Sequence, residues 1–308
     1  MDVAVLGSPT SWYLRDLTRA AGTSHRIVPA TFRQLTAAVD PTRQKITSAD
    51  LDLSSFDAVL VRTMPPGTLE QVVFRMDVLG RLAASGVTVL NPPRAVEAAV
   101  DKFLATARLQ AAGLHVPRTI ACQTADEALA AFEQLGRDVV IKPLFGSEGR
   151  GITRVNDLAL AERAFRMLEQ LGAVIYLQEF IEHEGYDLRL LVIGEQTLAM
   201  RRRNPHDWRT NVSRGATAEA FTPETHLIEL ARRAAQALEA PLAGVDILPA
   251  RDGTLYLIEV NAVPGWQALA AATNQDVARL VLDLVETSAK RPSQPNSAPT
   301  NPSPSGRC

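Results

Sequence analysis

The amino-acid sequence predicts an α/β unit followed by two α+β units. Short apolar runs alternate with helical stretches through the first 92 residues, which is the pattern of a parallel sheet. A pair of prolines then opens a long helix, and beyond it the order of helices and strands changes and ends in a hairpin. At 308 residues, of which 46% are hydrophobic, the chain is long enough for two or three buried cores.

The first unit is expected at residues 1–92. Three apolar runs in it have the length and composition of strands: 3–7, 58–62 and 87–91. A helical stretch at 69–84 connects the second run to the third. The proline pair then opens one helix that is expected to continue to Gly113. We expect residues 93–117 to link the first unit to the second.

The second unit is expected at residues 118–176 and the third at 177–287. In the second, the predicted elements are a strand after Arg118, a helix at 126–136, a strand ending at Lys142, a strand at 152–155 and a helix at 158–171. In the third, they are strands at 174–180, 187–193 and 197–203, a polar loop at 204–218, a helix at 222–239 and a hairpin at 244–261, with Asp252-Gly253 at its turn. The remaining residues, 288–308, are mostly Pro, Ser and Asn, and we expect them to be disordered.

Composition limits the partners of the chain. A formal charge of -2 and a pI near 6.2 give no long-range field for capturing nucleic acid or an anionic membrane. The sequence contains no signal segment and no apolar stretch long enough to span a bilayer. Two cysteines without a CxxC pair fit a reducing compartment, so we expect a cytoplasmic protein.

The stretch VVIKPLFGSEGRGI, residues 139–152, places Lys142 at the end of an apolar run and just before a glycine-rich loop. Burying a lysine ammonium group is costly unless an anion or a carboxylate accompanies it. Gly146, Gly149 and Gly151 would let consecutive backbone N–H groups close over phosphate oxygens. The stretch is therefore a candidate phosphate site. The alternative is a flexible hairpin in which Lys142 pairs with a carboxylate.

A second group of candidates belongs to the predicted hairpin. Glu259 and Asn261 are two residues apart in a strand and therefore point to the same side. Asp246 lies across from them, within one residue, if 251–253 form the turn. Carboxylate and amide oxygens suit a hard cation such as Mg²⁺. We favour a metal site over the alternative, in which Glu259 and Asn261 merely end an edge strand, because a buried acid in an apolar run is costly.

Several arginines are candidates for binding phosphate or carboxylate groups, because a guanidinium group binds both in a bidentate manner. They lie on two predicted strands and on the loop that follows: Arg189, Arg201, Arg202, Arg203, Arg209 and Arg214. A solvated surface position is the simpler explanation for most of them. Arg189 differs because its neighbours are apolar, and we place it among the nucleotide-binding residues. Asp187, on the same side of that strand, suits a ribose hydroxyl or an ion pair with Arg189.

Asp101 and Lys102 interrupt an otherwise apolar stretch, and a solvated helical face explains this pair well on its own. The sequence contains no HExxH, no GxSxG and no cysteine placed to pair with a histidine. We therefore expect the chemistry to come from a nucleotide and a metal ion, and not from a side-chain nucleophile.

Taken in order, these segments resemble the ATP-grasp ligases of the RimK-like family. The segments are DK at 101–102, VVIKPLFGSEGRGI, LQEFI, DLR, AMRRR, WRTN, GVDIL and IEVN, and they cover about residues 87–285. The resemblance implies a pre-ATP-grasp α/β domain followed by a two-subdomain ATP-grasp fold that holds ATP with Mg²⁺ (or Mn²⁺). It also implies a ligase in which a carboxylate attacks the γ-phosphate and an amine then displaces phosphate from the acylphosphate.

The resemblance assigns roles residue by residue. Lys102 and Lys142 resemble the lysines that contact the nucleotide phosphates, and Gly146, Ser147, Glu148, Gly149 and Gly151 resemble a flexible lid. Gln178, Glu179, Phe180 and Ile181 resemble the hinge that contacts adenine, and Asp187 the ribose contact. Asp246, Glu259 and Asn261 match the metal ligands, while Arg202, Asn211 and Arg214 resemble the groups around the γ-phosphate and the acceptor carboxylate. The chain departs from the family's RGG at Arg214-Gly215-Ala216, which matters if the second glycine needs a positive φ.

Two stretches, RTMPPGTLEQVVFRMD and EVNAVPGWQAL, look most similar to the tetrahydromethanopterin-associated glutamate ligase-like proteins of this family. The similarity implies that glutamate, or a similar amino acid, is added to a small pterin carboxylate. Trp12, Tyr13 and Trp266 are candidates for stacking on the flat ring, and Arg62 for binding a carboxylate. Packing in the core is the simpler explanation for any one of them.

Other functions also fit parts of the sequence. A ligase acting on a protein or carrier-protein C-terminus is the nearest alternative, although an acidic carrier would favour a broad basic surface. A non-catalytic nucleotide-binding protein would not need the full set of metal ligands. A dinucleotide-dependent oxidoreductase would need a G-x-G-x-x-G segment, which VAVLGSPTSW lacks. We therefore expect small-molecule carboxylate and amino-acid substrates, no nucleic acid and no membrane, and the chain is compatible with a homo-oligomer.

Overall fold

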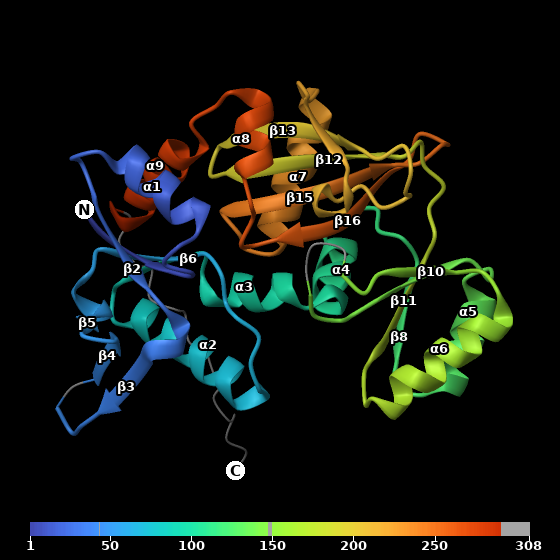
Figure 1. The fold of residues 1–308 in the computed structure, drawn as a ribbon, viewed down its shortest axis with the longest axis horizontal. Coiled ribbons are helices and arrows are strands. Elements are labelled where there is room, and N and C mark those ends of the chain that lie inside the picture. Colours follow the sequence, from blue (N-terminus) through green and yellow to red (C-terminus); the bar gives the residue numbers. More distant parts are fainter. Residues whose placement is uncertain (43, 147–149, 291–308) are drawn as a thin grey trace, which may run out of the picture.

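A computed structural model of the chain describes residues 1–42, 44–146 and 150–290 (Figure 1). Four strands and their helices form an N-terminal unit, two helices lead from it through the centre, and two further sheets follow. This is the mixed α/β and α+β architecture predicted from the sequence. Within the described residues, no helix has the length and hydropathy needed to cross a membrane.

The N-terminal unit is built on a parallel sheet with the strand order β2-β1-β6-β7. Its strands are β1 (Asp2–Leu6), β2 (Arg26–Ala30), β6 (Ala58–Val61) and β7 (Thr88–Leu90), and its helices are α1 (Trp12–Ala21) and α2 (Leu69–Ala84). α1 packs on one face, together with the C-terminal helix α9 (Val277–Lys290), and α2 packs on the other. β2 and β6 lie on opposite sides of β1, so the connections after β1 and β6 diverge. Ligands are expected outside the carboxyl ends of these two strands.

A small antiparallel sheet in this unit was not predicted. It consists of β3 (Leu35–Val39), β4 (Gln44–Ser48) and β5 (Leu51–Asp52), flanked by the 3₁₀ turns η1 (Phe32–Gln34) and η2 (Leu53–Ser55). β3 is almost wholly exposed, so its sequence carries no strong apolar alternation.

The linking segment corrects one prediction, because the expected single helix is two helices, α3 (Pro93–Val100) and α4 (Lys102–Ala111). Asp101 between them has φ -87° and ψ 104°, outside the helical region. Its side chain accepts a hydrogen bond from the Leu104 N–H at 3.0 Å and so caps α4. The break places Lys102 in the first turn of α4, where it reaches the glycine-rich loop.

The small subdomain is a four-stranded sheet with the order β10-β9-β11-β8, so the strand predicted at 174–180 belongs to this subdomain and not to the third unit. Its elements are β8 (Thr119–Cys122), α5 (Ala125–Gln134), β9 (Val139–Lys142), β10 (Thr153–Val155), α6 (Leu158–Gln170) and β11 (Ile175–Glu179). α5 and α6 cover one face and form a separate hydrophobic core with it. The other face carries Lys142, Tyr176 and Gln178, because the register pairs Tyr176 with Lys142.

The large subdomain is a five-stranded antiparallel sheet with the order β14-β13-β12-β15-β16. Its elements are β12 (Tyr186–Ile193), β13 (Gln196–Arg203), η3 (Val212–Arg214), β14 (Thr217–Ala220), α7 (Thr225–Ala237), β15 (Leu242–Pro249), β16 (Leu255–Asn261) and α8 (Gln267–Thr273). α7 covers one face. α8 and α9 cover part of the other face, and the rest of that second face carries the charged residues described below.

The N-terminal unit and the large subdomain share their hydrophobic cores, whereas the small subdomain has its own. Asn91, which follows β7 and is 1% exposed, connects the two larger parts. Its side-chain amide donates to the Leu242 and Ala262 carbonyls at 2.6 and 2.5 Å and accepts from the Leu242 N–H. The carboxyl edge of the parallel sheet therefore abuts the end of β16.

Candidate functional site

The strand register of the large sheet collects the predicted charged residues on one face. Residues directly opposite in neighbouring strands share a face, and so do residues two apart in one strand. The opposite pairs are Asp187 with Arg202, Arg189 with Asp246, and Asp246 with Glu259, while Gly244 lies opposite Asn261. All of these side chains therefore lie on the face that α7 does not cover.

A β-bulge is required for this arrangement. The pairing of β15 with β16 shifts by one residue between Asp246 and Ile247, which leaves Ile258 as the extra residue. On one side of the shift, Leu257 lies opposite Ile247 in the core. On the other side, Glu259 lies opposite Asp246 on the charged face. Without the bulge, Glu259 would pair with Val245 and point into the core.

A buried ion-pair network joins β12, β13 and β15. Arg202 donates to both carboxylate oxygens of Asp187, from Nε at 2.7 Å and from Nη2 at 2.5 Å. Arg202 Nη2 also lies 2.8 Å from Asp246, and Arg189 Nη1 lies 2.6 Å from the other oxygen of Asp246. All four residues are more than nine-tenths buried. The ion-pair partner of Asp187 is thus Arg202 and not Arg189, which corrects the sequence-based alternative.

The charges in this network differ in their response to burial. Burial alone would raise the pKa of Asp246, but Arg189 and Arg202 lower it below its usual value. Burial raises the pKa of Asp187, against the opposing effect of Arg202. Asp246 is thus held ionised by two guanidinium groups, as a metal ligand must be.

Gly244 is needed for the position of Arg189. A Cβ atom at this glycine would lie within 3.0 Å of the Arg189 guanidinium, which passes directly over the backbone. Sequence reasoning missed Gly244, although a glycine inside an apolar strand signals a close approach of this kind. It also missed Thr210, which is buried and hydrogen-bonds to Asp187.

We expect Gly244→Ala to destabilise the fold by about 1–3 kcal/mol, because the methyl group displaces the buried Arg189 from Asp246. Urea unfolding measures this change. Gly80→Ala is the matched control, because Gly80 lies in α2 with no neighbouring atom within 4 Å of its Cβ position, and alanine there should be neutral or stabilising. Equal stability of the two variants would contradict the assignment.

Glu259 is the carboxylate that lacks a counter-ion at hydrogen-bond distance. Within the described residues it accepts no hydrogen bond, while burial and Asp246 together raise its pKa. Lys102, Arg189 and Lys142 are near enough to oppose that shift. Asn261 Oδ1 accepts from the Val263 N–H at 2.8 Å and keeps a further lone pair. Two carboxylates and an amide oxygen on one face suit a hard cation.

In the described part of the chain, no three His, Cys, Asp or Glu side chains are grouped so that they could hold a metal ion. The predicted site has only two such residues, because its third ligand is an asparagine. The assignment therefore remains a prediction, which rests on the shared face and on the absence of a hydrogen-bond donor to Glu259 within the described residues.

The two predicted phosphate lysines face this cluster from the opposite side. Lys142 is 8% exposed, and its Nζ donates to Gln178 Oε1 at 2.5 Å. Burial lowers the pKa of Lys142 to about 8, although Glu259 opposes the shift. Lys102 Nζ donates to the Gly146 carbonyl at 2.7 Å, and burial lowers its pKa as well. Both ammonium groups act electrostatically on Glu259, so the two sheets face one another across this group of charges.

The predicted hinge, Gln178 to Ile181, begins in the last two residues of β11. The N–H groups of Glu179 and Phe180 donate to the carbonyls of Arg118 and Asp138. Within the described residues, the Ile181 N–H donates to no protein acceptor, so it is available to a ligand. The Phe180 ring packs between Arg154, whose guanidinium carbon lies 3.4 Å from the ring centroid, and Trp208.

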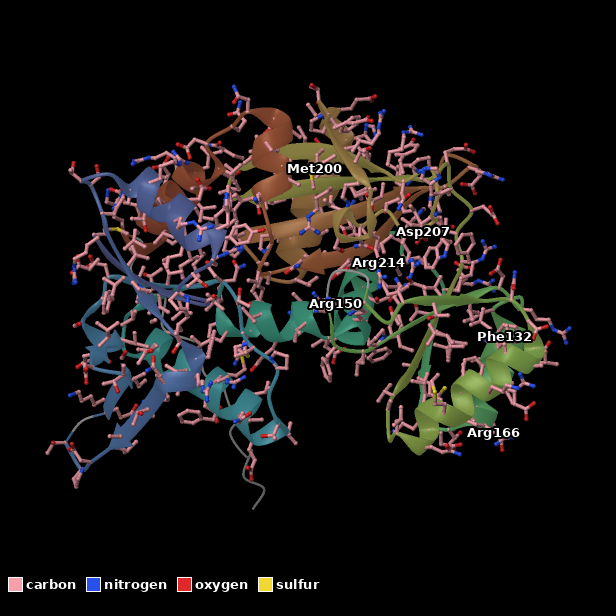
Figure 2. All side chains as sticks on the ribbon, in the orientation of Figure 1. Phe132, Arg150, Arg166, Met200, Asp207 and Arg214 are labelled. Carbon is pink, nitrogen blue, oxygen red and sulfur yellow. The ribbon has the colours of Figure 1, made fainter. Side chains whose placement is uncertain are left out.

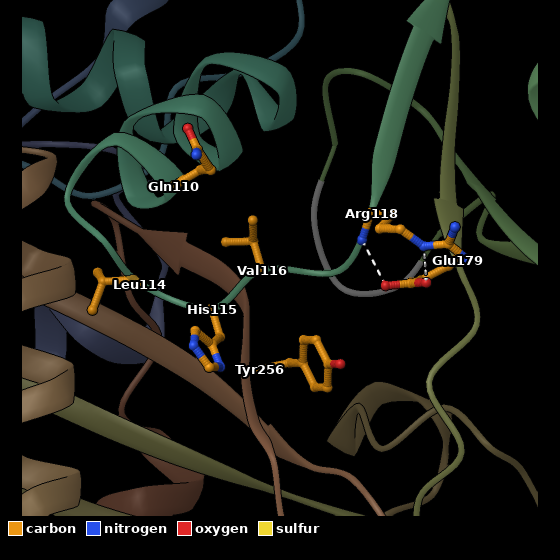
Figure 3. Close-up of a pocket in the computed structure, with 7 residues that line it drawn as sticks. All are labelled: Gln110, Leu114, His115, Val116, Arg118, Glu179 and Tyr256. Carbon is orange, nitrogen blue, oxygen red and sulfur yellow. Dashed lines mark hydrogen bonds and ion pairs between the residues drawn. The ribbon is translucent and has the colours of Figure 1, made fainter. Parts of the chain in front are cut away.

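A cavity of about 460 Å³ opens beside the hinge (Figure 3). Glu179 points into it and accepts from the Arg118 N–H at 2.7 Å and from Arg118 Nε at 2.6 Å. Its carboxylate therefore holds Arg118 against β11, so this side chain is not free to contact adenine. The cavity is lined by Gln110, Leu114, His115, Val116, Arg118, Glu179 and Tyr256.

The loop before β14 carries Asn211 and Arg214. Asn211 is half-buried and begins the turn η3, and Arg214 is exposed at its end. Figure 2 shows Arg214 in the central region of the molecule, where the large sheet, α4 and the β9–β10 hairpin approach one another. In the segment that departs from the family's RGG, Gly215 has φ +90°. Ala216 is buried and has no positive φ, so alanine fits there without strain.

The glycine-rich lid is described only at its two ends. Gly146 has φ +141° and Gly151 has φ +73°, which are conformations that favour glycine. A Cβ atom at Gly151 would also lie 2.8 Å from the Pro143 ring. The other predicted lid residues, Ser147, Glu148 and Gly149, lie outside the described residues.

The prediction that aromatic residues stack on a substrate ring is wrong for Trp266. Trp266 is fully buried, and its Nε1 donates to Asp16 at 3.0 Å, so it cannot stack on a ligand. Tyr13 packs edge-on against Trp266, with ring centroids 4.9 Å apart. The two rings enclose Arg62 and form part of the seam between the N-terminal unit and α8.

Comparison with known proteins agrees with this geometry. Residues 99–285 match the model of the RimK-like ATP-grasp domain. The chain is 34% identical to the tetrahydromethanopterin:alpha-L-glutamate ligase of Methanosarcina acetivorans, over 78% of this chain and 82% of that protein. It is 32% identical to a probable alpha-L-glutamate ligase of Nitrosococcus oceani, over 94% and 97%. It is also similar in structure to the ATP-grasp ligase PsnB bound to a precursor variant, Mg and ADP, with a TM-score of 0.74, 22% identity and coverage of 94% and 98%.

Proposed function

The chain belongs to the RimK-like ATP-grasp family, and from this premise we propose that it is an ATP-dependent ligase that joins the amino group of glutamate to a carboxylate. One observation supports the proposal most: Lys142 at the end of β9 and Lys102 at the start of α4 are both near enough to Glu259 on β16 to oppose the rise of its pKa. A triphosphate and its cation require positive groups on one side and carboxylates on the other. β9 and α4 supply the positive groups, and the charged face of the large sheet supplies the carboxylates.

The reaction has two steps. An oxygen of the acceptor carboxylate forms a bond to the γ-phosphorus while the bond to ADP breaks. The amine nitrogen of glutamate then forms a bond to the acyl carbon. The bond from that carbon to the bridging oxygen breaks, phosphate leaves with this oxygen, and the nitrogen loses a proton. The protein contributes position and charge, with Lys142 and Lys102 on the phosphates and the Ile181 N–H on the adenine.

A divalent ion, Mg²⁺ or Mn²⁺, would be held by Asp246, Glu259 and Asn261. When bound, it would neutralise charge on the phosphate oxygens during transfer. Arg202 is committed to two carboxylates, so we assign it to holding Asp246 and Asp187 in place. Asn211 and Arg214 lie on the loop in front of this face and are assigned to the acceptor carboxylate and the γ-phosphate.

We propose a small pterin-type carboxylate as the acceptor, in line with the name of the Methanosarcina acetivorans relative. A peptide acceptor is the second candidate, because the structurally similar PsnB was solved with a precursor. The formal charge of -2 gives no broad attraction for an acidic carrier, which favours the small molecule. We place the reaction in the cytoplasm, which the low cysteine content favours.

The direct test is a turnover screen. Purified protein with ATP and Mg²⁺ is incubated with a panel of amino acids and with pterin, small-molecule and peptide carboxylates, and ADP release and product mass are measured. We expect ADP release that requires both glutamate and one acceptor, with a product heavier by one or more glutamyl units. ADP release that needs neither partner, or no turnover with any pair, would contradict the proposal.

The depressed pKa of Lys142 predicts a pH dependence of ATP use. An ammonium with a pKa of about 8 is charged below that pH and neutral above it, so the attraction for phosphate is lost as the pH rises. We expect kcat/KM for ATP to fall between about pH 7 and about pH 9. Lys142→Arg stays charged over this range, so its lower activity should not show the same fall. A wild-type profile that stays flat would be evidence against a phosphate-binding Lys142.

A further inference from the structure

Arg62 is a buried cation outside the phosphate and metal cluster. It follows β6 and is 5% exposed. The rings of Tyr13 and Trp266 lie over its guanidinium group, with their centroids 4.6 and 4.2 Å from the guanidinium carbon. Its Nη2 donates to the Pro264 carbonyl at 2.8 Å. The two rings cover the plane of the group, so further partners can approach only along its edge.

Most of the hydrogen-bonding capacity of Arg62 is unused. Within the described residues, Nε and Nη1 are buried and have no hydrogen-bond partner. No carboxylate of the described residues pairs with Arg62, whereas Arg189 and Arg202 on the charged face both have one. Burial lowers the pKa of Arg62 to about 10, which reflects the same lack of compensation. A buried arginine without a counter-ion is costly, and a carboxylate is the partner that would compensate it best.

The position of Arg62 is suited to a substrate. It stands at the carboxyl end of β6, beside Gly7 at the end of β1, where the connections of the parallel sheet diverge. Its partner Pro264 is three residues beyond Asn261, so the chain keeps the guanidinium within roughly 15 Å of the predicted metal ligand.

We propose that Arg62 binds a substrate carboxylate that does not take part in the reaction, and so selects acidic substrates. The inference rests on the proposed ligase function and names the recognition residue for it. The carboxylate comes from one of two sources, either glutamate or a second acid group on the acceptor. Access to Nε and Nη1 requires the seam between Tyr13 and the segment around Pro264 to open by a small movement.

Arg62→Lys tests the proposal, because it keeps the charge and loses the planar fork. We expect the KM of the substrate that Arg62 recognises to rise about 10-fold to 100-fold, while the KM for ATP changes less than about twofold. Glutamine and the α-amide of glutamate test whether the recognised carboxylate belongs to glutamate. An acceptor whose second carboxylate is amidated tests whether it belongs to the acceptor. For the amidated substrate, which lacks the recognised carboxylate, we expect a high KM in the wild type and the same high KM in Arg62→Lys.

Arg75→Lys is the matched control. Arg75 is also buried, at 7% exposure, and also donates to a proline carbonyl, that of Pro65 at 2.7 Å. Its substitution should leave the discrimination between acid and amide unchanged. Tyr13→Leu keeps Arg62 and removes one ring, so it should raise the same KM by about threefold to tenfold even if Arg62→Lys folds poorly.

Titration calorimetry separates the inference from the proposed function. L-glutamate, and separately the acceptor, is titrated into wild type and into both variants without turnover. Binding to the wild type that weakens in Arg62→Lys supports the inference even if the screen for ligation fails. Equal binding and equal KM for every acid and amide in wild type and Arg62→Lys would overturn it and leave Arg62 with a structural role only, whether or not the wild type is a ligase.

Discussion

We expect Glu259→Gln to reduce ATP-dependent amide formation by about 1,000-fold or more while the protein stays folded. Among the described residues of the charged face, Glu259 is the carboxylate that is not paired with an arginine, and it lies opposite Asp246 because of the bulge. Glutamine preserves the size of the side chain and removes the charge that a divalent ion requires. Because phosphoryl transfer depends on charge neutralisation, the loss should be large and should fall on kcat. Steady-state assays over a range of Mg²⁺ concentrations measure it.

The control for this variant is Glu169→Gln, an exposed glutamate at the end of α6. Its activity should match the wild type. Thermal unfolding should show that Glu259→Gln remains folded, because burial, which raises the pKa of Glu259, favours an uncharged side chain at this position. Turnover of Glu259→Gln within tenfold of the wild type at saturating Mg²⁺ would exclude Glu259 as a metal ligand.

Arg202→Met lowers the free energy of unfolding by about 3–5 kcal/mol, the largest stability change that we expect from one substitution in this chain. The reason is that Arg202 compensates Asp187 and Asp246 together, at 2.5 and 2.8 Å, in a buried position. Its removal leaves Asp187 without a cation and Asp246 with Arg189 alone. Denaturant unfolding at neutral pH measures the change.

An exposed ion pair provides the comparison for Arg202. Arg19 also pairs with two carboxylates, Asp16 and Asp276, but its side chain is 56% exposed. Solvent screens that pair, so Arg19→Met should cost about 0–1 kcal/mol. The double variant Arg202→Met with Asp187→Asn should recover part of the loss, because it removes one uncompensated charge. A loss for Arg202→Met no greater than for Arg19→Met would show that the network is not a source of stability.

Periodicity and residue chemistry predicted the fold class and most of the elements, and the resemblance of the ordered motifs predicted the family. Lys142 could be singled out because a cation in an apolar strand needs a partner, and Glu259 because an acid in an apolar strand does. Two-residue spacing placed Glu259 and Asn261 on one side. Such arguments succeed where a single residue breaks a strong local pattern.

The remaining features depend on tertiary contacts that local patterns do not contain. The break at Asp101 was missed because the stretch from 93 to 113 contains good helix formers, and only the cap to Leu104 reveals the boundary. Asp187 pairs across strands with Arg202, and not along its own strand with Arg189, because register decides which charges meet. The chemistry of Trp266 fits either a ligand contact or a core residue. Its contacts with Tyr13 and Asp16 in the structure show that it is a core residue.

The one-residue shift in the last hairpin limits how this sequence can change. One residue added beside Ile258, with a single bulge kept, would move Glu259 from opposite Asp246 to opposite Val245 in the core, although every residue of the motif would still be present. Insertions at the turn around Asp252-Gly253 would lengthen the hairpin without that effect, since the turn lies on the far side of the shift. Descendants of this chain should therefore tolerate length variation at the tip and no added residue between Leu257 and Glu259.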